Sequence, residues 1–240
     1  TDAATDETQA EISPDGTKIV YVSRPKTSSD QTIKVMNIDG TNQIALTGSD
    51  TGNASPSWSP DGTKIIFQAD NTTDLFSDTG IWVVNADGTG LVRISKNTKK
   101  DYEGPDWSPD GTRVAFVMDQ EIYVMNIDGT GETKLTDGGM FHYLSPKLRP
   151  VWSPDGTKLL YTRINKEAPS ISDSAQAFLM NADGSNPVKL TDGTGRAWSA
   201  DSTKILVYRT STSAGSQLIQ INSDGTGETV LPLNGNEGTW

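Results

Sequence analysis

Carboxylates dominate the side chains of this sequence that could do chemistry. The 240 residues include 31 Asp and Glu, 20 Lys and Arg, one histidine and no cysteine. A pair of acids could serve a glycosidase as general acid and base, and an acidic loop could bind calcium. The lack of cysteine excludes thiol nucleophiles and cysteine-ligated zinc or iron–sulfur sites. Because His142 is the only histidine, a metal site with two histidines is also excluded.

Nine of these acids belong to two short motifs that recur along the chain. The first motif is Ser-Pro-Asp-Gly and the second is Asp-Gly followed by Thr or Ser. Their aspartates are Asp15, Asp61, Asp110 and Asp155 in the first, and Asp39, Asp87, Asp128, Asp183 and Asp224 in the second. Asp-Gly between two strand-like runs predicts a hairpin turn, because Gly accepts the positive φ of a tight turn. Without these nine, 22 acids face 20 basic residues, so most of the net charge of −11 comes from turns.

The "DGTG" segments at Asp87–Gly90 and Asp128–Gly131 have a superficial likeness to ligand-binding loops. A dinucleotide loop needs a helix after its glycines, and here a strand-like run follows. A calcium loop of the EF-hand kind has Gly at position six, whereas "NIDGTGE" from Asn126 has its first Gly at position four. We interpret both segments as hairpin turns and expect no metal and no cofactor.

The motifs mark a repeat of nearly constant length. The residue directly before the Ser of each first motif is Ile12, Trp58, Trp107, Trp152 or Trp198, and Trp240 closes the chain. The steps are 46, 49, 45, 46 and 42 residues. Each repeat reads as four short strands: one ending at the aromatic, an alternating run such as "TKIVYVS", one of the "IYVMN" type and one of the "TKLT" type. The sequence predicts an all-β propeller with five blades, each a four-stranded antiparallel sheet.

We expect a single propeller domain over residues 1–240. Its repeats fall at about 8–52, 53–101, 102–146, 147–193 and 194–240. A five-bladed ring is favoured. A six-bladed ring stays open, because Thr1 lies where a preceding fourth strand would end and "NEGTW" ends on the first-strand aromatic of a further blade. Trp58, Trp107, Trp152 and Trp198 hold equivalent positions and should pack between adjacent blades.

The recurring "WSPDGTK" segment resembles the repeat of the TolB-type propeller family, which is related to the WD40 propellers. The resemblance covers Ile12 to Leu231. It implies four-stranded blades around a central axis, and its members include periplasmic, cell-surface and protease-associated propellers. Two blades depart from the pattern: the first has Ile12 in place of Trp, and the fifth has Ala200 and Ser202 in place of Pro and Gly. Such departures are typical of terminal repeats.

Long, variable connections are expected after the second and fourth strands, which end on one face of the blades. Binding residues are usually placed on such loops. The loop "GGMFHYLSPKLRP" from Gly138 is the richest in aromatic and basic residues. The candidate ligand-binding residues are Phe141, His142, Tyr143 and Arg149, with Phe76 and Tyr102 from neighbouring blades. The alternative is that Phe141 and Tyr143 are hydrophobic filler.

These features predict a non-catalytic binding or scaffolding propeller that recognises protein or glycan through its loop face. The composition fits an extracellular, cell-surface or periplasmic protein. No catalytic residue is assigned, since no G-x-S-x-G motif is present and the several histidines implied by likeness to oligogalacturonate lyases are missing. A carbohydrate-active lyase or hydrolase that uses loop acids stays open, as does a regulatory propeller of a larger hydrolase. The negative charge argues against nucleic acid, and no apolar run is long enough for membrane insertion.

Overall fold

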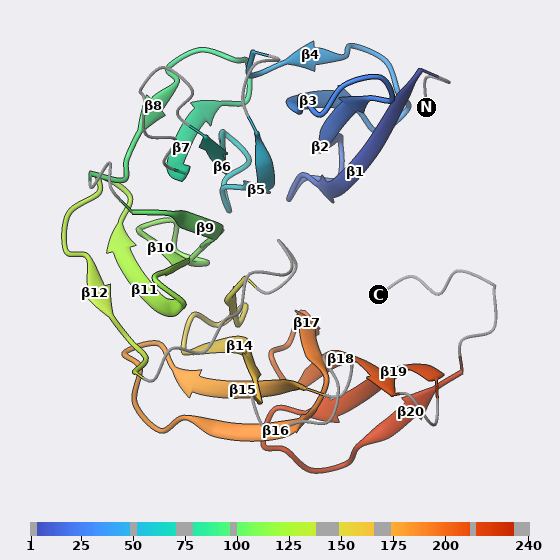
Figure 1. The fold of residues 1–240 in the computed structure, drawn as a ribbon, viewed down its shortest axis with the longest axis vertical. Coiled ribbons are helices and arrows are strands. Elements are labelled where there is room, and N and C mark those ends of the chain that lie inside the picture. Colours follow the sequence, from blue (N-terminus) through green and yellow to red (C-terminus); the bar gives the residue numbers. More distant parts are fainter. Residues whose placement is uncertain are drawn as a thin grey trace. The chain divides into compact units, whose positions relative to one another are not determined.

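A computed structural model describes residues 4–48, 52–70, 79–96, 100–137, 149–165, 174–211 and 215–232. Within these ranges the chain forms β-strands joined by turns (Figure 1). The strands make five sheets, each built from four consecutive antiparallel strands. The predicted all-β fold with five four-stranded blades is confirmed. In the described part of the chain, no helix is long and apolar enough to cross a membrane.

The first compact unit, residues 1–134, contains three blades. Blade one consists of β1 (Thr5–Ile12), β2 (Lys18–Pro25), β3 (Thr32–Asn37) and β4 (Ile44–Ala45). Blade two consists of β5 (Ala54–Trp58), β6 (Lys64–Asp70), β7 (Thr79–Asn85) and β8 (Val92–Arg93). Blade three consists of β9 (Tyr102–Trp107), β10 (Arg113–Met118), β11 (Glu121–Asn126) and β12 (Thr133–Lys134).

The second compact unit, residues 135–240, contains two blades. Blade four consists of β13 (Val151–Trp152), β14 (Lys158–Ile164), β15 (Ala175–Asn181) and β16 (Val188–Asp192). Blade five consists of β17 (Thr194–Trp198), β18 (Lys204–Ser211), β19 (Gly215–Asn222) and β20 (Thr229–Leu231). In all five blades the first strand ends at the position predicted from the repeat.

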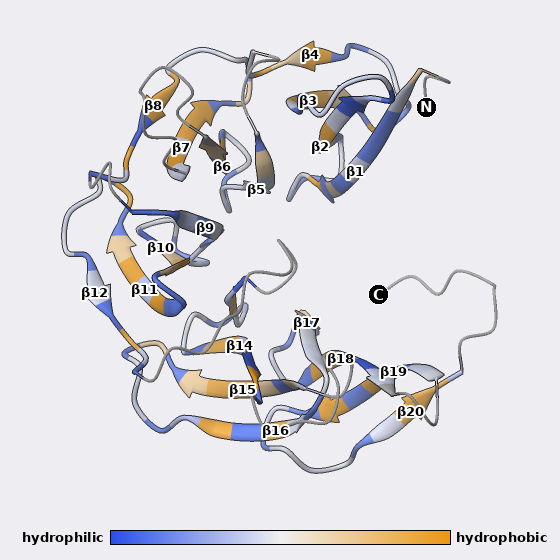
Figure 2. Cartoon of the chain, viewed as in Figure 1, coloured by the Kyte–Doolittle hydropathy of each residue, from blue (hydrophilic) through white to orange (hydrophobic). Residues whose placement is uncertain are grey.

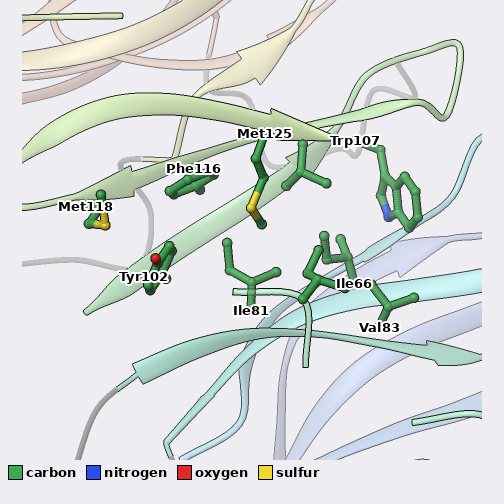
Figure 3. Packing of buried hydrophobic residues seen from close by; sticks show 10 residues of the cluster. Ile66, Ile81, Val83, Tyr102, Trp107, Phe116, Met118 and Met125 are labelled. Atoms are coloured by element: carbon green, nitrogen blue, oxygen red, sulfur yellow. The ribbon is translucent and has the colours of Figure 1, made fainter. Parts of the chain in front are cut away.

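Neighbouring blades within a unit enclose a hydrophobic core. The middle strands of each blade alternate in side-chain direction, and the hydropathy colouring shows their apolar stretches (Figure 2). In the first unit, Ile66, Ile81 and Val83 of blade two pack against Tyr102, Phe116 and Met125 of blade three (Figure 3). A second cluster joins blades one and two, and a third joins blades four and five. Burial of apolar area between the sheets is the main force that holds each unit together.

The repeated tryptophans connect adjacent blades. Trp58 and Trp107 are 4% and 7% exposed. The indole N–H of Trp58 donates to the carbonyl of Glu11 (3.2 Å), and that of Trp107 donates to Ser57 (3.3 Å). Trp198 is half-buried against the core of blades four and five and repeats this bond to Val151 at 3.3 Å. The predicted role as an anchor between blades is confirmed for Trp58, Trp107 and Trp198.

A β-bulge interrupts the first strand of a blade shortly before the aromatic position. The register shifts there in β1, β5, β9 and β17. Gln9, Ser55 and Gly104 occupy this place with φ of 52°, 53° and 55°. A bulge leaves a backbone N–H without a partner in the ladder, and a side chain of the preceding blade accepts it. Gln68 Oε1 accepts the Gly104 N–H at 2.8 Å, and Thr162 Oγ1 accepts the Gly195 N–H at 3.3 Å.

Candidate binding surface

Each Ser-Pro-Asp-Gly turn, and the corresponding Ser-Ala-Asp-Ser turn of blade five, is closed by the same side-chain hydrogen bonds. In blade one, Ser13 Oγ donates to Asp15 Oδ1 (2.6 Å), and the Thr17 N–H donates to the same oxygen (3.0 Å). The Lys18 N–H donates to Ser13 Oγ (2.9 Å). Equivalent bonds close the turns at residues 59–64, 108–113, 153–158 and 199–204. The motif therefore has a structural role, which is to close the hairpin turn between the first and second strands of a blade.

These bonds also fix the protonation state of the turn aspartates. Donation from Ser13 and then from Thr17 lowers the pKa of Asp15 to about 2. Donation from the turn Ser lowers the pKa of Asp110 and of Asp201 to about 2 as well. A general acid works best with a pKa near the working pH. The carboxylates of the first motif stay ionised and are unsuited to proton transfer near neutrality.

The Asp-Gly-Thr motif forms the second hairpin turn, as predicted. The Thr130 N–H and hydroxyl both donate to Asp128 Oδ1, at 2.8 and 2.6 Å. Gly129 has a φ of 75°, and a Cβ there would lie 2.0 Å from the carbonyl oxygen of Ile94 in the neighbouring blade. Glycine is therefore required both by the turn and by the contact between blades. Among the described residues, no group of three or more His, Asp or Glu could hold a metal ion.

Four of the six predicted ligand-binding residues, Phe76, Phe141, His142 and Tyr143, lie outside the described residues. Of the other two, Arg149 is partly exposed just before β13. Tyr102 is fully buried, its ring lies 5.3 Å from that of Phe116, and its hydroxyl donates to Glu132 Oε2 at 3.0 Å. The structure thus places Tyr102 in the core between blades two and three, and its ring offers no open contact surface.

The acids near Tyr102 form a small polar group at the loop side of blade three, where connections after second and fourth strands lie. Asp101 Oδ1 accepts the backbone N–H of Thr79 from blade two at 3.2 Å. Lys100 and Asp119 form an exposed ion pair. Partial desolvation by neighbouring atoms, and secondarily the charge of Asp101, raises the pKa of the Glu103 carboxyl, although the residue is exposed at the surface. Glu103 is the described loop-side acid whose environment moves its pKa toward neutrality, as a general acid requires.

An open pocket of about 460 Å³ lies on the opposite, turn side, between blades two and three. The first-motif turns of both blades form its walls, and Trp107 and Ile127 contribute apolar surface. Lys64, which also lines the pocket, donates to Asn85 Oδ1 at 2.8 Å. Since the pocket is made of turn residues that already bond to one another, it presents few free polar groups to a ligand.

The repeated turns, the indole bonds between blades and the capped bulges define a β-propeller built from one blade motif used five times. The sequence profile of the TolB beta propeller domain matches residues 8–239. The chain belongs to this family, and the resemblance read from its repeats is confirmed.

A curated relative is an uncharacterized protein of Agrobacterium fabrum, 32% identical over an alignment of 166 residues that covers 63% of this chain and 53% of the relative. TolB from Acinetobacter baumannii has a similar structure, with a TM-score of 0.70 at 19% identity, covering 90% of this chain and 53% of TolB. An oligogalacturonate lyase in complex with manganese gives a TM-score of 0.71 at 14% identity, covering 95% and 65%. At these identities the structural likeness shows the fold alone. The chain spans about half the length of the curated relative and of the Acinetobacter TolB.

Proposed function

We propose that this chain is a non-catalytic binding propeller that recognises a protein partner through the loop side of its blades. The observation that carries the proposal is the bonding of the repeated carboxylates. Each first-motif aspartate accepts hydrogen bonds within its own turn. The repeat builds the scaffold, so recognition falls to the connections that differ from blade to blade.

The loop of residues 138–150 is the centre of the proposed surface. Phe141, Tyr143 and His142 provide aromatic area there, and Arg149 can bond a carboxylate or stack on a ring. Phe76 contributes from the connection of blade two. Aromatic and Arg side chains are enriched at the energetic centres of protein interfaces. The TolB relationship supports an extracytoplasmic, periplasmic location for this activity.

Immobilised protein should capture a partner from a periplasmic extract, and the Phe141→Ala, Tyr143→Ala double variant should lose most of that capture. Ile38→Ser is the matched control, because Ile38 is 52% exposed in the turn after β3 on the opposite side. It should keep capture. Equal loss from both variants, with melting temperatures unchanged, would contradict a loop-side site.

A carbohydrate-active enzyme is the second candidate, and one observation favours it. The pKa of the Glu103 carboxyl is shifted upward, which is the direction that favours a general acid, and the fold is shared with an oligogalacturonate lyase. A screen against uronate-containing and neutral polysaccharides tests this candidate, with Glu103→Gln as the variant that must abolish any activity found. Activity that survives Glu103→Gln would remove Glu103 from that role.

A further inference from the structure

One position in the first strand separates blade five from the other four. The residue two places before the end of the first strand falls in the bulge of β1, β5, β9 and β17, and directly before β13 in blade four. It is Ala10, Pro56, Pro105, Pro150 or Arg196 in blades one to five. The three prolines are buried. Only in blade five does this position carry a charge, so the scaffold does not need one there.

The guanidinium of Arg196 is half-buried, and its described neighbour is an aromatic ring. Its Cζ lies 5.3 Å from the ring centroid of Tyr208, in the neighbouring strand β18. Burial lowers the pKa of Arg196, although the group remains a cation at neutral pH. Among the described residues, no carboxylate pairs with it. A partly desolvated cation without a counter-ion lowers stability unless a ligand supplies the anion.

Arg209 in the same blade shows how this unit treats a structural arginine. Its two terminal nitrogens donate to Glu228 Oε1 and Oε2 at 3.0 and 3.1 Å. Its Nε donates to the carbonyl of Asp192 at 2.9 Å, and Thr191 Oγ1 accepts a further bond. These bonds pair Arg209 with a carboxylate of its own blade and join blade five to blade four. Among the described residues, Arg196 has no comparable set of partners, so its described contacts do not give it the structural role of Arg209.

We propose that Arg196, supported by Tyr208, binds a carboxylate of an acidic segment in a protein partner. Stacking on an aromatic ring uses one face of the guanidinium and leaves its N–H edge free for a bidentate bond to a carboxylate. Thr194 pairs with Tyr208 in the ladder, which places Tyr208 in the loop-side half of the blade. A single free guanidinium fits one carboxylate. An oligouronide carries a carboxylate on every sugar and would need several cations in a row. The other arginine of blade five that has been described, Arg209, is already paired with Glu228.

This inference rests on the proposed binding function and supplies a chemical group for it. The test uses a capped tetraglutamate peptide at low ionic strength, with capped tetraglutamine and digalacturonate as comparison probes. Isothermal titration calorimetry measures the affinity of the wild type and of each variant. In the wild type, the Arg196 Nε–Hε NMR resonance, assigned by its loss in Arg196→Ala, shows whether the peptide binds at Arg196. The variants are Arg196→Pro and Arg196→Ala, which restore residues found at this position in the other blades. Arg163→Gln is the matched control, because it removes one positive charge from another arginine beside an aromatic ring. Arg163 Cζ lies 5.1 Å from the centroid of the Phe178 ring.

The expected result is an affinity for tetraglutamate that falls about tenfold or more in both Arg196 variants, as loss of a charged hydrogen bond predicts. Arg163→Gln should bind tetraglutamate with nearly the wild-type affinity, and tetraglutamine should not bind.

Both Arg196 variants should melt at the wild-type temperature or above it. A lower melting temperature in both would make Arg196 structural and overturn the inference. Unchanged affinity of both Arg196 variants for tetraglutamate would also overturn the inference, as would binding of digalacturonate in preference to tetraglutamate. Partner capture that survives Arg196→Pro would overturn this site while leaving the proposed function intact. Peptide binding at Arg196 without any captured partner would support this site and contradict the proposed function.

Discussion

Removal of the Trp107 side chain should destabilise the first unit more than any loop change. The indole is 7% exposed, packs in the core shared by blades two and three, and donates to the carbonyl of Ser57 at 3.3 Å. A buried Trp removes roughly 150–250 Å² from water, worth about 4–6 kcal/mol at about 25 cal/mol per Å². Since Ala keeps part of that contact, we expect Trp107→Ala to lower the free energy of unfolding by about 3–5 kcal/mol.

The repeat provides a control at the same position of another blade. Ile12 is 58% exposed, so Ile12→Ala should change the free energy of unfolding by less than about 1 kcal/mol. Urea unfolding followed by circular dichroism measures both variants, and the change in midpoint gives the difference. If Trp107→Ala loses no more stability than Ile12→Ala, burial between the blades is not what the tryptophans provide.

Two further predictions concern the turns. Hydrogen bonds lower the pKa of Asp110 from 3.8 to about 2, so its contribution to stability is present above pH 4 and is lost as the pH falls toward 2. Asp110→Asn should therefore lower the unfolding midpoint at pH 7 and make little difference at pH 2; an equal loss at both pH values would show that charge is irrelevant. Gly129→Ala should lower the unfolding midpoint more than Gly40→Ala, because both have positive φ but only at Gly129 would a Cβ meet a backbone oxygen, 2.0 Å away. Similar losses in the two would mean that Ile94 moves aside at little cost.

The fold could be predicted from the sequence because each repeat carries its own turn chemistry. Asp and Gly at the hairpins, and the aromatic at the end of the first strand, act over a few residues, so local reading suffices. The caps on the bulges could not be found in this way. Gln68 is 36 residues from Gly104, and nothing near either residue marks the bond between them. Contacts between blades depend on the packing of whole sheets, which no short motif encodes.

The candidate site was harder to predict for a related reason. Tyr102 stands in a run of charged and polar residues, "KKDYEGPD", which is typical of an exposed loop. In the structure Tyr102 begins β9, and its ring faces the core beside Phe116. Strand alternation decides the direction of each side chain, and a strand boundary misplaced by one residue reverses it. Aromatic content alone therefore overestimates how much of a loop is available for binding.

Departures from the repeat are more informative than the loops, because the other blades show what the scaffold needs at each position. Ser202 replaces Gly with a φ of 59°, yet its hydroxyl accepts the N–H of Asp155 in blade four at 3.1 Å, so this departure is compensated by a bond between blades. Ile12 replaces Trp where the side chain is mostly exposed, so little packing is at stake. Arg196 stands where three other blades have Pro, in a half-buried position, and among the described residues its printed contact is the Tyr208 ring. A charge that the other blades do without, and that gains no ion pair among the described residues, is accounted for by the proposed contact with a carboxylate of a partner.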